Sequence, residues 1–413
     1  MDKRVSVSKK RSLLCLVAGF LALIPSRGRA DNPMGDAPLS AWNEDESWAF
    51  EPGKEVAGGA LDLRSMNEHI AGEHGFLRLS EDGNGYVRGD GRPIRLWGVA
   101  ADVGSKMSDE DAATLARFLA RMGVNAVRVG GASPGLVPQE EGQVITDINE
   151  AELNKIWRTV AFMKKEGIYT RISPFWDHGS IKYINPAWGI EGYKSGDRLN
   201  ALLFFEPTVQ RGYKAWMKAL LTRPNPLTGI AIKDDPAVAI IQIVSEDSIF
   251  FWWVRDIHGG PLLELQGQFG DWARERYGSL DHAFEAWDNA AVEGDDVGRG
   301  RVGLYNLYHL TEHPPTQNVR RLRDQTAFML HTERTFYAEM KAYLKEELGA
   351  RQLIGPSNFG PADKIRMLDL QRYSWTACDV IEQNGFYSTK LKGQHSLWRV
   401  QAGHTFNPRS AVL

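Results

Sequence analysis

The 413-residue sequence has very few cysteines. Of the two, Cys15 lies in a segment that we expect to be removed on export, so Cys378 is left as the single cysteine of the mature chain. One cysteine cannot form an internal disulfide. The stability of the mature protein must therefore come from a packed core.

The sequence also has no large excess of charge of either sign. Lysine and arginine together number 49, aspartate and glutamate 52, and the formal net charge is −3. Proteins that bind nucleic acid usually carry a basic patch or stripe, because the phosphate backbone dominates their affinity. The balance of charge therefore predicts no nucleic-acid partner. Nothing in the composition indicates an oligomeric state.

The most pronounced apolar run near the amino terminus, residues 13–24, is too short to cross a bilayer. Basic residues precede this run, and small residues at positions 28 and 30 offer a cleavage site before Asp31. A basic start, a short apolar run and a small-residue site are typical of a secretory signal peptide. We predict that residues 1–30 are removed after Ala30, and that the mature protein is secreted or periplasmic without a membrane anchor.

Two kinds of ligand motif are missing as well. No glycine-rich phosphate loop follows the first predicted strand, where residues 97–101 stand, so a dinucleotide-binding fold has no support. Asp177 and His178 form an isolated pair, and no histidine elsewhere completes a set with metal-ligand spacing. We therefore predict neither a cofactor nor a metal ion.

Strand and helix patterns do alternate along most of the chain. Predicted strands cover residues 94–101, 124–129, 168–174, 237–244, 351–355 and 380–383. Predicted helices cover residues 109–122, 150–165, 207–221, 262–277, 280–287 and 316–348, the first with Ser108 as its cap. This alternation favours an α/β fold with a parallel sheet, most simply a (β/α)8 barrel of which six strands are visible. A doubly wound open sheet is the alternative.

The predicted barrel has a lead-in of a different character. Residues 31–90 begin loosely and then contain short strands at 76–79 and 86–88, separated by turn residues at 82–85. Asp90 and Gly91 form a further tight turn. The domain organisation we predict is a signal peptide at 1–30, a lead-in with a β-hairpin at 31–90, and an incomplete barrel at 91–413.

The predicted strand at residues 237–244 is the most informative part of the chain. It is apolar throughout, as expected for a strand covered on both faces, and it stops at Ser245, Glu246 and Asp247. In an α/β barrel the carboxyl ends of the strands face the active site. An acid there, followed by aromatic residues at 250–253, suggests a sugar site. The alternative is that Ser245 or Asp247 only caps the next helix.

The chain resembles the clan A glycoside hydrolases, and within them the cellulase-like, family five type of retaining enzyme. The resemblance lies in residues 75–98, 116–129, 234–247, 351–360 and 377–387, in their order and spacing. It implies a (β/α)8 barrel whose fourth strand ends at the acid/base glutamate. Counting the predicted strands independently places Glu246 at that position.

The resemblance assigns further residues to substrate binding. Ser245 stands where the family has an asparagine that holds the sugar 2-hydroxyl, and Arg128 matches the arginine that keeps the nucleophile ionised. Asn384 stands where the family tends to have a histidine. Trp176 and Trp252 follow predicted strand ends, and we expect them to stack on sugar rings.

The nucleophile that the resemblance requires is not found. A retaining enzyme needs two carboxylates about 5–5.5 Å apart, and the family takes the second from the end of its seventh strand. Only six strands are predicted before Leu413, and Glu382 lies where the family has an acidic residue with another role. We expect an exported retaining β-glycoside hydrolase whose chain is truncated before the nucleophile. The alternative is a non-catalytic glycan-binding protein on a decayed hydrolase scaffold.

Overall fold

The computed structural model describes residues 59, 62–130, 135–175, 184–311 and 318–384, and two short strands at 389–390 and 405–406. The expected signal peptide and Trp176 lie outside the described residues. The chain divides into two compact units. Residues 51–384 form one; residues 1–50 and 385–413 form the other, whose described part is an antiparallel pair, β9 (Thr389–Lys390) and β10 (Thr405–Phe406).

The larger unit begins with the antiparallel lead-in that the sequence predicts. Its three strands pair in the order β1 (Arg78–Leu79), β2 (Tyr86–Val87) and β3 (Pro93–Ile94). Gly83 and Gly91 take positive φ values of 71° and 84° in the two turns, a conformation that costs glycine little. Leu77 and Tyr86 pack with Ala237 and Leu353 in one apolar cluster, so the lead-in covers the amino-terminal side of the main sheet.

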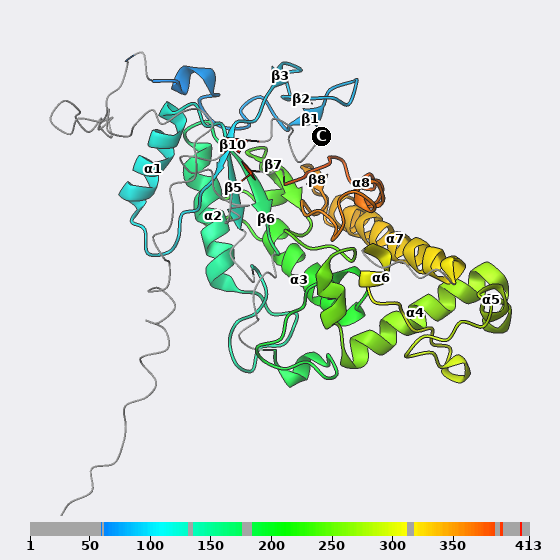
Figure 1. Cartoon of the computed structure of the whole chain (residues 1–413). Coiled ribbons are helices and arrows are strands. Elements are labelled where there is room, and N and C mark those ends of the chain that lie inside the picture. The colour runs from blue at the N-terminus through cyan, green and yellow to red at the C-terminus, as the bar shows by residue number, and fades with distance from the viewer. Residues whose placement is uncertain are drawn as a thin grey trace, which may run out of the picture. The chain divides into compact units, whose positions relative to one another are not determined.

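The main sheet has five strands, each parallel to its neighbour (Figure 1). In spatial and sequence order they are β4 (Gly98–Ala100), β5 (Ala126–Gly130), β6 (Tyr169–Ser173), β7 (Val238–Gln242) and β8 (Leu353–Gly355). Every residue of β7 is buried, which explains why it is apolar at every position except Gln242. Sequential parallel strands joined by helices are the arrangement of an α/β, barrel-like fold.

The first predicted strand, residues 94–101, is divided between the two sheets. Ile94 belongs to β3 of the lead-in, whereas β4 begins only at Gly98. Between them, the Asn125 side chain accepts the N–H of Trp97 at 2.7 Å and donates to the carbonyl of Arg95 at 2.8 Å. An amide side chain therefore takes hydrogen bonds that a continuous strand would have made with its neighbour.

Six of the eight described α-helices lie where the periodicity predicts them. The eight are α1 (Asp109–Arg121), α2 (Glu150–Lys164), α3 (Pro207–Thr222), α4 (Gly259–Tyr277), α5 (Leu280–Ala286), α6 (Tyr308–Thr311), α7 (Val319–Ala342) and α8 (Leu368–Trp375). Ser108 caps α1 by accepting the N–H of Asp111 at 3.0 Å, as expected. Helices α6 and α8 were not predicted. In the described part of the chain no helix is both long and apolar enough to span a membrane.

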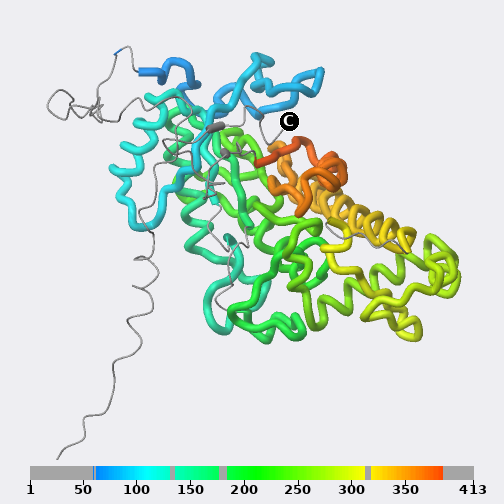
Figure 2. Tube along the Cα trace, in the orientation of Figure 1, coloured from blue at the N-terminus to red at the C-terminus, as the bar shows by residue number. Residues whose placement is uncertain are grey.

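The connection from β7 to β8 carries helices α4 to α7 and extends sideways from the sheet (Figure 2). Its core is partly polar. The guanidinium of Arg321 on α7 is fully buried, bonds to the carboxylate of Asp295 at 2.9 Å and lies 5.1 Å from the ring centroid of Trp287. A buried cation is tolerated here because it is paired and hydrogen-bonded.

The predicted sixth strand at residues 380–383 is not formed. The N–H of Ile354 on β8 donates instead to the Asp379 carboxylate at 2.9 Å, and Lys341 holds that carboxylate at 2.7 Å. The side chain of Asp379 thus occupies a hydrogen-bonding position that a sixth strand would need. Within the described residues the parallel sheet has five strands rather than six.

Candidate active site at the carboxyl edge of the sheet

Glu246 lies just beyond the carboxyl end of β7 in an unusual backbone conformation. The chain stays aligned with its neighbours up to Ser245, whose N–H donates to the carbonyl of Phe175 at 2.8 Å. Glu246 then takes φ of +53°, a region that residues other than glycine rarely adopt. Its N–H donates to the Asn358 side-chain oxygen at 3.0 Å. Such conformations persist where surrounding contacts impose them, and they concentrate at functional sites.

The carboxylate of Glu246 is half-buried and held by an amide. Asn384 donates from its side chain to Oε1 of Glu246 at 2.9 Å. Asn358 in turn donates from Nδ2 to Oδ1 of Asn384 at 2.8 Å, and its carbonyl accepts the N–H of Asn384 at 2.8 Å. The two asparagines thus fix both the backbone and the side chain of Glu246. The structure brings Asn384 to Glu246, although not from the end of a strand.

Arg128 reaches the same edge from β5. Its Nε donates to the Ser173 hydroxyl at 3.1 Å, another guanidinium nitrogen donates to the Ser245 hydroxyl, and Ser173 donates to Gln242 at 2.6 Å. Burial lowers the pKa of Arg128, and the nearby charge of Arg171 lowers it further. Among the described residues, no carboxylate lies within ion-pair distance of Arg128.

Ser245 also belongs to this group. Ser245 is fully buried, and its hydroxyl accepts a hydrogen bond from Arg128. The hydroxyl therefore supports the arginine, and its contact with a sugar 2-hydroxyl stays a prediction. The sequence-based prediction missed two residues of the site, Asn358 and Gln242. Gln242 is the last residue of β7 and Asn358 follows β8, and both carry side chains able to donate and accept hydrogen bonds.

Glu382 lies near the site but is engaged elsewhere. Its carboxylate pairs with both the Nε and an amino group of Arg171, with 2.5 Å between Nε and Oε1. Gly355 permits this approach, because a Cβ at that position would lie 3.1 Å from the carboxyl carbon of Glu382. The two hydrogen bonds from the arginine fix the orientation of this carboxylate and favour its ionised form.

The aromatic residues after β7 have different environments. Phe250 is fully buried and belongs to the core. Trp252 is partly exposed, with the Arg255 guanidinium 4.9 Å from its ring centroid. Phe251 meets Phe359 edge-on, with ring centroids 4.6 Å apart. Phe359 directly follows Asn358, whose side chain contacts Glu246. In the sequence, this aromatic pair is therefore closer than Trp252 to a residue that contacts Glu246.

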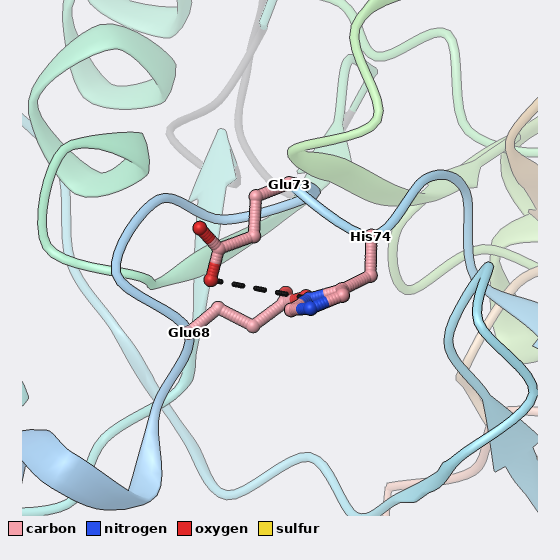
Figure 3. A group of neighbouring side chains, drawn as sticks. All are labelled: Glu68, Glu73 and His74. Carbon is pink, nitrogen blue, oxygen red and sulfur yellow. Dashed lines mark hydrogen bonds and ion pairs between the residues drawn. The ribbon is translucent and has the colours of Figure 1, made fainter.

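A second group of polar side chains lies at the lead-in (Figure 3). Glu68, Glu73 and His74 place one possible metal-ligand atom each within 4.8 Å of one another. Glu68, however, already bonds to Nδ1 of His74 at 2.5 Å, to the N–H of Gly72 at 3.2 Å and to the hydroxyl of Tyr169. The group is explained as a hydrogen-bonded anchor between the lead-in and β6. Asp177 and His178 lie outside the described residues.

Comparison with known proteins identifies short stretches of similarity. No protein-family model matches the chain. It is 36% identical over 88 residues to mannan endo-1,4-beta-mannosidase 2 of Arabidopsis thaliana, which covers 21% of this chain and 18% of that protein. It is 33% identical over 104 residues to mannan endo-1,4-beta-mannosidase 5 of the same plant, covering 25% and 21%. The chain thus spans about a fifth of the length of these relatives.

Among solved structures, an endo-1,4-beta-mannanase from Rhizomucor miehei matches with a TM-score of 0.31 and 12% identity, over 74% of this chain and 98% of that one. The sequence similarity, although local, is to glycoside hydrolases.

Proposed function

We propose that this protein is a retaining β-glycoside hydrolase in which Glu246 is the general acid/base. The observation that carries the proposal is the fixing of Glu246 at the carboxyl edge of the sheet by Asn358 and Asn384. A general acid must keep one orientation toward the leaving oxygen, and both amides serve that end. In glycosylation Glu246 would donate its proton to the glycosidic oxygen, and in the second step it would accept a proton from water.

The nucleophile in this proposal is a carboxylate that lies over Arg128. The guanidinium has two hydroxyl partners and, among the described residues, no carboxylate partner. A half-buried cation of this kind favours the ionised form of an acid placed beside it. We assign the nucleophile to a carboxylate other than Glu382 and Asp247, because Glu382 stands where the resembling family has an acidic residue with another role and Asp247 is fully buried.

We further propose a β-1,4-linked mannan as the substrate. The support is the local sequence similarity to two mannan endo-1,4-beta-mannosidases. Trp252, the Phe251–Phe359 pair and Trp176 are the aromatic residues that would stack on sugar rings, although Trp176 lies outside the described residues. Export by the segment 1–30 is part of the same proposal, since a polymeric glycan is met outside the cytoplasm.

A second candidate is a non-catalytic glycan-binding protein. The observation in its favour is that Arg128 has no carboxylate partner among the described residues, and that an asparagine rather than a histidine contacts Glu246. Such a protein would bind mannan without cleaving it.

The test is hydrolysis of β-1,4-mannohexaose by the full-length gene product, followed by proton NMR of the first anomer released, with cellohexaose as the matched sugar control. We expect cleavage with the β-anomer formed first, and its loss in Glu246→Gln. Binding without cleavage by the full-length product would favour the second candidate. If the full-length product neither binds nor cleaves either sugar, both candidate functions are contradicted.

A further inference from the structure

Six residues with fully buried polar side chains form a closed hydrogen-bonded ring next to Glu246, in which backbone N–H groups are the donors of three of the six bonds. They come from the end of β7, the end of β8 and helices α7 and α8, and are Asp247, Ser248, Glu333, Tyr337, Ser357 and Gln371. We call this set the buried ring. The members of the ring that follow β7 lie at least 85 residues from those on α7 in the sequence, so only the tertiary fold brings them together.

One half of the buried ring runs from Asp247 to Glu333 through α8. The Asp247 carboxylate accepts the N–H of Ser248 at 2.8 Å, and the Ser248 hydroxyl donates to Oε1 of Gln371. Gln371 then donates from Nε2 to Oε1 of Glu333 at 2.9 Å. Each amide and hydroxyl along this half has a defined direction of donation.

The other half returns through the end of β8. The Tyr337 hydroxyl donates to Oε1 of Glu333 at 3.3 Å and accepts the N–H of Ser357 at 3.3 Å. The Ser357 hydroxyl accepts the N–H of Asp247 at 3.2 Å, which closes the ring. Oε2 of Glu333 is buried and has no partner among the described residues.

The buried ring touches the candidate site through two chain neighbours. Asp247 follows Glu246 directly, and Ser357 directly precedes Asn358, which holds the Glu246 backbone. Asp247 also accepts the N–H of Ala201 at 2.7 Å, which ties the segment before α3 to the same point. A shift of either ring residue would therefore change the backbone from which Glu246 projects.

We propose that Glu333 is a positioning residue for Glu246, acting through the buried ring with Asp247 as its partner at the other end. This rests on the proposed role of Glu246. The ring holds the left-handed turn at Glu246 as long as its carboxyls are not both charged, because no cation pairs with either of them among the described residues. Ionisation of both would place two uncompensated charges in one buried network.

The electrostatics of the ring agree with this role. Burial raises the pKa of Asp247 to about 7 and that of Glu333 to about 8. The titratable groups that face Glu333 are Asp247 from the end of β7 and Tyr337 from its own helix, with Cys378 close to Tyr337. Burial also raises the pKa of Tyr337 and of Cys378, so both stay neutral over the range in which the two carboxyls titrate.

The experiment follows the Glu246 carboxyl directly, by carbon NMR of the full chain labelled with glutamate carrying carbon-13 at Cδ. The Glu246 signal is assigned by its absence in Glu246→Gln. In the wild-type chain we expect this signal to change between pH 7 and 9, where both carboxyls of the buried ring titrate. Glu333→Gln keeps an acceptor oxygen and the size of the side chain but cannot ionise, so the part of this change that comes from Glu333, near pH 8, should disappear. Glu339→Gln, an exposed position on the same helix, should leave it unchanged.

A Glu246 signal with the same titration in Glu333→Gln as in the wild type would overturn the proposal, whether or not the protein hydrolyses a glycan. If the NMR result is as expected but no glycan is cleaved or bound, the positioning contact stands and the proposed function fails. In a hydrolytically active full-length product, Glu333→Leu should lower kcat at least tenfold with KM changed less than twofold. Glu333→Gln should restore kcat below pH 7. Equal losses in both variants at every pH would mark Glu333 as only structural.

Discussion

The side-chain amide of Asn384 donates a 2.9 Å hydrogen bond to Oε1 of Glu246, although 138 residues separate the two in the sequence. Asn384 is itself held at both its backbone and its side chain by Asn358, which also accepts the N–H of Glu246. The orientation of the proposed acid therefore depends on a pair of asparagines, where the resembling family tends to place a histidine.

Asn384→Ala should lower kcat of the full-length hydrolase by roughly 10- to 100-fold, because a hydrogen bond to an ionisable group contributes about 1.5–3 kcal/mol. The measurement is steady-state kinetics on β-1,4-mannohexaose. Asn384→His retains a ring N–H donor and should lose less activity than the alanine variant. Equal activity in all three proteins would show that the contact does not orient Glu246.

Glu246→Ala should slow hydrolysis of a natural mannan by roughly 10²–10⁴-fold, the usual contribution of a general acid. An activated aryl β-glycoside needs no proton on its leaving group, so its glycosylation step should slow much less. The measurement is the ratio of the two rates in the variant and the wild type. Azide should then partly restore turnover, since its nitrogen can attack C1 of the glycosyl-enzyme without base assistance and release the carboxylate with formation of a β-glycosyl azide. Equal losses on both substrates, with no response to azide, would contradict the assignment.

The position of Glu246 could be predicted from the sequence because it depends on local pattern. The buried run that becomes β7 is apolar on both faces, and the polar residues after it mark the edge of the sheet. Helices α1 to α5 and α7 were predicted for the same reason, since their caps and periodicity lie within a few residues of one another. Ser108 and its bond to Asp111 are an example.

The buried ring and the absence of a sixth strand could not be predicted in this way. Gln371 accepts the hydrogen bond of the Ser248 hydroxyl, although 123 residues separate them in the sequence. Glu333 lies in an ordinary amphipathic helix, whose pattern does not distinguish it from its neighbours. The segment 380–383 reads as a strand by its apolar residues, but the Asp379 side chain takes the hydrogen bond of Ile354 that pairing would require. Both outcomes depend on side chains that meet only in the folded protein.

Arg128→Met should abolish most turnover of the full-length hydrolase with little loss of stability. Burial already lowers the pKa of Arg128, and the charges of Glu246 and Glu382 offset this only in part. Replacing the cation by an apolar side chain removes the cost of burying the charge and loses two hydrogen bonds from a charged group to hydroxyls, each contributing about 1.5–3 kcal/mol, so the two effects on stability partly cancel. The measurement pairs kcat/KM with the thermal unfolding midpoint. A variant that unfolds and loses activity together would show that Arg128 holds the sheet instead of the nucleophile.

Glu333→Gln should become more stable than the wild type as the pH rises from about 4.5 to 8. In the folded chain burial raises the pKa of Glu333 to about 8 from 4.5, so the folded state keeps a proton that the unfolded state releases over this range. The stability of the wild type must therefore fall with rising pH, by up to about 1.4 kcal/mol per pH unit for this group. The loss begins near the unfolded pKa and is complete above the folded one.

Glutamine has no proton to release, so the variant lacks this term and the difference between the two proteins should widen until about pH 8 and then level off. Urea unfolding at pH 5, 6, 7 and 8 measures it, with Glu339→Gln as the exposed control on the same helix. Parallel stability curves for wild type and Glu333→Gln across this range would show that Glu333 is ionised in the folded protein, and would remove the electrostatic basis of the buried ring.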